Sequence, residues 1–245
     1  SAGRMLWRYL DAHKIDADAL FTRCGLNPAL IHESHTRYPY HLLCRAYVEA
    51  RAIVADDNIG LEIARHFSPL DLNALGVTFL SSATLLEACQ RLMRYEAVVN
   101  SNLKFSISKS DDRIDLISEV SNVPGDAARI VEDSRTAVLV ALCRMGLDTA
   151  LDPVEVAFTY PEPDRAGEHF GIFRCPVTFS QPLSRISFNT ADVGRPFAAS
   201  NRELAMNSDR ILESMIKELN SANIVSQVKR AIIDTLPSGT PTQDD

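Results

Sequence analysis

The chain lacks an excess of basic residues. Its 25 lysines and arginines are outnumbered by 32 aspartates and glutamates, so the formal net charge is -7. A protein that binds nucleic acid on its own usually carries a basic surface that neutralises phosphates. The chain alone is therefore a poor candidate for nucleic-acid binding. It also lacks an apolar run long enough to span a membrane, so no membrane association is expected.

Closely spaced cysteine pairs and recognisable targeting signals are also missing. The five cysteines are scattered along the chain: Cys24, Cys44, Cys89, Cys143 and Cys175. An odd, dispersed set favours reduced thiols over a disulfide framework. Together with the lack of a visible signal peptide, it predicts a cytoplasmic protein. Because the first residue is Ser1 rather than methionine, we expect a chain trimmed from a longer protein.

Motifs of common enzymes are absent too. There is no G-x-S-x-G, Walker A or G-x-G-x-x-G sequence. His32, His35 and His41 could gather around a metal, but the histidines of "HESH" lack the spacing of a zinc protease. His169 and Cys175 could pair as base and thiol nucleophile. A thiol- or metal-dependent hydrolase stays open as an alternative. Loop histidines and a core cysteine are the simpler interpretation, and no cofactor is expected.

Helical periodicity dominates the residues that are present. Apolar residues recur at helical spacing in the following segments: 4–24 (two short helices), 40–53, 58–67, 84–99, 126–146, 200–220 and 221–236. Asp16 is expected to begin a helix, and Thr84 another in a capping box with Glu87. Within residues 126–146, Met145 is expected to face inward with the aliphatic residues, whereas the charges of "EDSRTA" are expected to be mostly solvated.

Alternating apolar and polar residues predict a few strands. Residues 103–120 alternate on both sides of a polar turn at Ser110-Asp111-Asp112, which is typical of a hairpin. Residues 154–160 predict a single strand, and residues 177–189 a second hairpin. No βαβ alternation is visible. We therefore expect an α+β fold, mostly helical, with a small antiparallel sheet of about four to five strands.

A ligand pocket is expected where the helix at 84–99 leads into the first strand. An arginine at such a junction can bind a carboxylate or phosphate, and the scarce aromatic residues can wall an apolar cavity. The candidate ligand-binding residues are Tyr47, Phe79, Ser82, Arg94 and Tyr95. The alternative is that the arginine lies on a polar surface and the rings fill the core.

A dimer interface is expected on the helix at 200–220. Its apolar stripe contains Leu204, Ile211, Met215 and Leu219, which suits a partner helix in a homodimer. The same stripe could equally pack against its own domain.

Three segments together resemble a known family. They are "LFTRCGLNPALI", "LGVTFLSSATLLEACQRLMRYEAVV" and the stretch from "VEVAFTYPEPDRAGEHFGIF" through "RCPVTF" to "NRELA". In this order they resemble the N-terminal effector domain of AraC-type transcriptional regulators, in its arabinose-binding-like branch. The resemblance covers residues 4–220. It implies a small-molecule sensor that controls the dimerisation and activity of an attached DNA-binding module.

The resemblance also divides the chain. Residues 1–220 would be the effector-binding and dimerisation domain. Residues 221–245 would be the first helix and turn of a helix-turn-helix domain, with Thr240 beginning the next helix. DNA would be bound only through the missing C-terminal part. Nothing in the sequence requires a sugar as the effector. A dimerisation module without a ligand is a further alternative.

Overall fold

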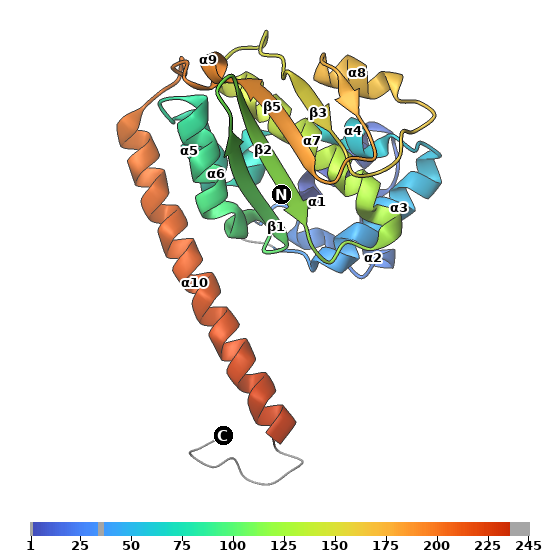
Figure 1. The fold of residues 1–245 in the computed structure, drawn as a ribbon. Coiled ribbons are helices and arrows are strands. Elements are labelled where there is room, and N and C mark those ends of the chain that lie inside the picture. The colour runs from blue at the N-terminus through green and yellow to red at the C-terminus, as the bar shows by residue number, and fades with distance from the viewer. Residues whose placement is uncertain (1, 34–36, 236–245) are drawn as a thin grey trace.

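The computed structural model describes residues 2–33 and 37–235, and side-chain environments up to residue 221. Within these residues, helices form most of the structure and one five-stranded sheet covers part of them, so the expected α+β class is confirmed (Figure 1). No helix among the described residues has the length and hydrophobicity that crossing a membrane requires.

The N-terminal part is a group of short helices. Their bounds are α1 Ala2–Ala12, α2 Ala17–Arg23, α3 Tyr40–Val54 and α4 Ile59–Ala64. Asp16 accepts a hydrogen bond from the Ala19 amide at 2.9 Å and so caps α2, as the sequence predicted. After α2 the chain turns through Gly25, whose φ of +82° favours glycine.

Two further helices lead into the sheet. They are α5, Ala74–Leu80, and α6, Leu85–Val99. Thr84 caps α6 by accepting a hydrogen bond from the Glu87 amide at 3.3 Å. The expected capping box is only half formed, because the Glu87 carboxylate accepts from the Ala83 amide rather than from that of Thr84.

The sheet has the strand order β1-β2-β5-β3-β4. The strands are β1 Leu103–Lys109, β2 Arg113–Val120, β3 Glu155–Ala157, β4 Val177–Thr178 and β5 Ser184–Asn189. β1 and β2 form the predicted hairpin. The helices cover one face of the sheet and leave the face toward the viewer open (Figure 1). That open face is polar, with Arg113 and Arg185 both paired to Glu155.

The second predicted hairpin is wrong. β5 pairs with β2 and β3 rather than with β4, and β4 instead runs parallel to β3 at the sheet edge. The sheet is therefore mixed rather than antiparallel. The helix between β3 and β4, α8 at Gly167–Phe173, supplies the crossover that a parallel pair needs.

The long helix α7, Gly125–Gly146, packs against the sheet and against α3 and α4. Its buried residues include Ile130, Val138 and Leu142. Two expectations fail on this helix. Met145 is 51% exposed, because it lies on the outer face of α7, whereas Leu142, Cys143 and Gly146 in the same turn are buried. Glu132 and Asp133 are buried instead of solvated.

The C-terminal helix α10 spans Arg202–Thr235 after the short helix α9, Thr190–Val193. Its first half packs against α5 and α6, and its second half extends beyond the rest of the structure (Figure 1). The expected break between helices near residues 220–223 is wrong, since α10 runs through it. The predicted helix start at Thr240 lies outside the described residues.

A glycine sets how closely α4 and α7 approach. A Cβ added at Gly60 would lie 2.5 Å from the Ile130 carbonyl oxygen and 2.9 Å from the Asp133 Cβ. We expect the Gly60→Ala variant to lose about 1–3 kcal/mol of unfolding free energy, because the helices must separate. Urea denaturation would measure it. Gly171→Ala is the control: nothing lies within 4 Å of the added carbon, so stability should stay equal or rise by up to about 1 kcal/mol. Equal effects of both variants would contradict the close packing.

Candidate functional site

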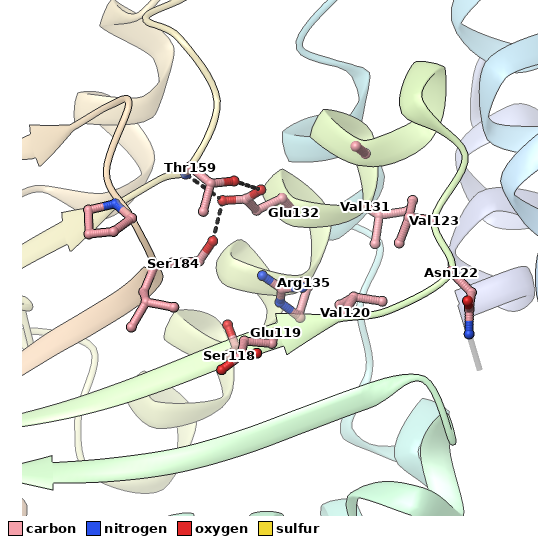
Figure 2. A pocket seen from close by; sticks show the side chains of 13 residues that line it. Ser118, Glu119, Val120, Asn122, Val123, Val131, Glu132, Arg135, Thr159 and Ser184 are labelled. Atoms are coloured by element: carbon pink, nitrogen blue, oxygen red, sulfur yellow. Dashed lines mark hydrogen bonds between the residues drawn. The ribbon is translucent and has the colours of Figure 1, made fainter.

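A pocket of about 430 Å³ lies where α7 crosses the ends of β2 and β5 (Figure 2). Its apolar lining consists of Val120, Val123, Ala128, Val131, Pro182 and Leu183. The neutral polar lining consists of Ser118, Asn122, Thr159 and Ser184. The charged lining consists of Glu119, Glu132 and Arg135. The volume lies within the range of small-molecule sites.

The sheet creates this pocket by changing from large to small residues. On the face toward α7, β2 and β5 pair Ile114 with Phe188 and Leu116 with Ile186. The next inward pair is Ser118 with Ser184, and both side chains are buried. Two serines occupy much less volume than the apolar pairs beside them. Space therefore remains between this end of the sheet and α7.

Glu132 forms one wall of the pocket, and its carboxylate is fully engaged. It accepts hydrogen bonds from the Thr159 amide at 2.9 Å and from the Thr159 hydroxyl at 2.8 Å. A third comes from the Ser184 hydroxyl (Figure 2). These bonds tie α7 to β5 and to the segment after β3. They also satisfy the charge that burial of a carboxylate would otherwise penalise.

Arg135 lies one turn further along α7 and has no such partner. No hydrogen bond or ion pair to it is formed by the described residues, and its Nε atom is buried. Burial lowers the pKa of its guanidinium, while Glu132 and Tyr40 act in the opposite direction. In Figure 2 the dashed lines end on Glu132, and none reaches Arg135. The pocket therefore contains one half-buried cation without a paired anion.

A second polar network lies behind this wall. The Asp133 carboxylate accepts a hydrogen bond from the Tyr160 hydroxyl and lies 3.0 Å from the Nε2 of His169. Arg129 lies 3.6 Å from its other oxygen and donates to Asn58. Burial first, and then Asp133, raise the pKa of Tyr160. Both Asp133 and His169 are fully buried, so the network fixes α7 against α8 and α4.

The ligand-binding residues expected from the sequence do not share this pocket. Tyr47, Phe79, Ser82 and Tyr95 are all buried. The Arg94 side chain is 64% exposed and is paired with Glu213 of α10 at 2.8 Å. The Tyr47 hydroxyl donates to the Ala2 carbonyl at 3.4 Å. The Ser82 hydroxyl accepts a hydrogen bond from Arg91 at 3.0 Å. Burial, with a smaller contribution from Asp209, raises the pKa of Tyr95 to about 12. The role of all five in binding stays a prediction.

A second pocket, of about 530 Å³, lies between the start of α6 and the start of α10. Its lining includes Glu87, Arg91, Arg202 and Met206. Arg91 is paired both to Glu87, at 2.5 Å, and to Asp209 of α10, at 3.2 Å. Arg91 is therefore neutralised internally, in contrast to Arg135, and Arg202 of this pocket is exposed to water.

The residues of the apolar stripe expected at the dimer interface differ in exposure. Leu204 is 45% exposed and Ile211 54% exposed. Met215 is partly buried against the core, and Leu219 is partly buried as well. Met215 therefore faces the chain's own domain, whereas Leu204 and Ile211 are free. A role in dimerisation stays a prediction.

The groups proposed for a hydrolase are not arranged for catalysis. His169 is enclosed by Asp133 and Tyr160 and makes no hydrogen bond to Cys175. Burial raises the pKa of the Cys175 thiol to about 11, so the thiolate is scarce at neutral pH. Among the residues that the structure describes, no group of three His, Cys, Asp or Glu could hold a metal. His35 lies outside those residues.

The sequence contains one signal for this site, the charged residues of "EDSRTA", which were expected to be mostly solvated. In "EDSRTA", Glu132 and Arg135 are three positions apart, so they share a helix face. Val131 and Val138 lie beside them in a helix whose apolar residues are mostly buried. A charged pair at such spacing on a buried helix indicates a polar site. Periodicity alone did not show that this face meets two serines.

Comparison with known proteins finds a matching family and related regulators. The family described as "Arabinose-binding domain of AraC transcription regulator, N-term" matches residues 15–197. The chain is 22% identical over 220 residues to the ornithine utilization regulator of Pseudomonas aeruginosa, covering 89% of this chain and 65% of that protein. The crystal structure of the transcriptional regulator CdpR from the same species shares the fold. Its TM-score is 0.63 and its identity 18%, over 84% of this chain and 60% of that one.

The chain thus spans less than two thirds of the length of either of these regulators. The family match extends from α2 to the segment before α10 and includes α7 and every strand that lines the pocket. The chain belongs to the family of arabinose-binding N-terminal domains of AraC transcription regulators.

Proposed function

We propose that this chain is the sensing part of an AraC-type regulator and that a small-molecule effector binds in the pocket between α7, β2 and β5. The observation that carries the proposal is the unpaired Arg135 in a pocket of small-molecule size. A half-buried charge without a paired anion is costly to the free protein, so a ligand that supplies this anion is favoured. The family and the two regulators support the regulatory role.

The regulated step is the assembly and DNA binding of a longer cytoplasmic protein. Residues 1–220 sense the effector, and residues 221–245 begin a helix-turn-helix domain that binds DNA. The exposed Leu204 and Ile211 on α10 are proposed to pack against the same helix of a second copy. A ligand shifts this equilibrium only if it binds the two states unequally. α10 is the element that can transmit the shift, since it packs on α5 and α6 and extends past them.

A fusion experiment tests the proposed function. The chain is placed before a DNA-binding domain that recognises its operator only as a dimer, and reporter repression is measured across a metabolite panel. We expect at least one compound to change repression severalfold. An Ile211→Glu fusion should bind the compound equally but no longer repress, because a charge enters the proposed interface.

Two outcomes would contradict the proposal. A fusion that represses independently of every compound would support a dimerisation module without a ligand. A fusion that never represses, with a chain that stays monomeric in light scattering at every concentration, would remove α10 as a dimer interface. Neither outcome would make the chain an enzyme, for which the geometry around His169 and Cys175 gives no support.

A further inference from the structure

Arg135 differs from the other arginines of the described residues. Most of them donate to a carboxylate or a carbonyl, as Arg129 and Arg144 do from the same helix. The arginines besides Arg135 that form no hydrogen bond or ion pair are Arg23, Arg45 and Arg202, and all three are exposed to water. Arg135 is the half-buried one in this group. Its missing partner therefore cannot be replaced fully by solvent.

The nearest carboxylate does not supply this partner. Both oxygens of Glu132 are held by Thr159 and Ser184, which turn the carboxylate toward β5. Glu119 is exposed at the pocket mouth and forms no ion pair with Arg135. Neither carboxylate therefore pairs with the guanidinium, although Glu132 lies near enough to raise its pKa. An anion from outside can reach it through the pocket.

The lining narrows the chemistry of that anion. A guanidinium offers a planar pair of donors that matches the two oxygens of a carboxylate. Much of the remaining lining is aliphatic, from Val120, Val123, Val131 and Leu183, beside the small polar residues named above. Among the described residues, no aromatic ring lines the pocket. An aliphatic body is accommodated by such walls, whereas a flat ring would find nothing to stack on.

We infer that the effector is a small organic carboxylate with an aliphatic body, whose carboxylate binds Arg135. This inference rests on the proposed function and specifies its ligand class. The carboxylate completes the charge pair that the free protein lacks, and the aliphatic chain displaces water from the valines beside it. Amino acids with aliphatic side chains and short fatty acids share this chemistry, and the test separates them.

Matched ligands test the charge requirement. The thermal midpoint, Tm, of the chain is measured with hexanoate, L-norleucine and L-ornithine, and with hexanamide and L-norleucinamide as neutral-head controls. We expect at least one carboxylate to raise the Tm and its amide to have no effect. If norleucine raises the Tm and hexanoate does not, the effector is an amino acid. If only hexanoate raises the Tm, the effector is a fatty acid.

Titration of the active compound against Arg135→Gln should show a tenfold to hundredfold loss of affinity. Arg45→Gln, at an exposed arginine, should bind like the native chain.

A measurement without ligand gives an independent readout. Arg135→Met removes an uncompensated charge but keeps the long side chain, so the Tm should rise by a few degrees. Arg129→Met, six residues earlier on the same helix, should lower it, because Asp133 and Asn58 lose their partner. A fall in Tm for Arg135→Met equal to that for Arg129→Met would contradict the inference.

The failures of the two proposals can be told apart. A neutral compound that binds in this pocket equally well in the native and Arg135→Gln chains would overturn the carboxylate and leave the sensor intact. Carboxylates that bind with unchanged affinity to Arg135→Gln would do the same. An absence of binding by every carboxylate, together with no gain in Tm for Arg135→Met, would overturn the inference. The proposed sensing role is contradicted only if repression by the fusion changes with no compound, charged or neutral.

Discussion

Replacing Asp133 by alanine is expected to lower the free energy of unfolding by about 3–5 kcal/mol. The carboxylate is fully buried and is the shared acceptor of Tyr160 and His169, with Arg129 on its other side. Its removal leaves a phenol, an imidazole and a guanidinium facing a cavity without an anion. Urea denaturation followed by circular dichroism would measure the loss.

Two companion variants separate charge from volume. Asp133→Asn keeps the shape but turns an amide donor toward one of the existing donors, so it should still lose about 1–3 kcal/mol. Asp152→Ala removes a carboxylate that pairs with Arg144 and Arg174 while 46% exposed. Exposed pairs contribute about 0–1 kcal/mol, and we expect a loss in that range. A loss for Asp133→Ala no greater than for Asp152→Ala would show that the buried network does not stabilise the fold.

The second large effect is expected at Glu132. Glu132→Ala removes the acceptor of three hydrogen bonds that join α7 to Thr159 and Ser184. We expect a loss of about 2–4 kcal/mol, since bonds to a charged group contribute more than neutral ones and Ser184 is left buried. The same change removes the negative charge nearest to Arg135. Chemical denaturation gives the stability, and ligand titration shows whether the pocket survives.

Glu132→Gln is the matched control for this position. Its amide oxygen can still accept from the Thr159 amide and the Ser184 hydroxyl, and its NH₂ group can donate to the Thr159 hydroxyl once that group rotates. The loss should therefore be near 1 kcal/mol. If glutamine and alanine were equally destabilising, the wall would depend on the charge of Glu132 rather than on its hydrogen bonds.

Much of the fold could be predicted because local chemistry decided it. Asp16 and Thr84 cap helices where their side chains find amide donors. The hairpin at residues 103–120 follows from strict alternation around a polar turn. The second hairpin failed because sequence alternation describes which face a residue occupies, not which strand lies beside it. β3 comes between β4 and β5 through pairing that no short window of sequence reveals.

The candidate site was not predictable in the same way. Its pocket needs Ser118 of β2 and Ser184 of β5 to meet under α7, and they are 66 positions apart in the sequence. Glu132 and Arg135 look like ordinary surface charges until that register is known. Arg94 attracted the prediction because it stands at a helix-to-strand junction, yet it pairs with Glu213 on the surface. Burial, which separates the two arginines, depends on tertiary packing.

The C-terminal helix also shows what periodicity in the sequence cannot predict. Leu204, Ile211, Met215 and Leu219 form one stripe by spacing, but the stripe is wider than the contact α10 makes with its domain. Met215 lies against the core, whereas Leu204 and Ile211 are exposed. A periodic pattern gives the apolar face of a helix and leaves its partner unspecified.

Hydrogen exchange with and without the carboxylate that raises the Tm most would test the central claim directly. If the effector binds at Arg135, amides in residues 118–123, 131–135 and 182–184 should become protected, and Arg135→Gln should abolish the protection at the same ligand concentration. Protection confined to the region of Phe79, Ser82 and Tyr95, and unchanged in Arg135→Gln, would contradict the account and return the site to the junction of α6 with the sheet.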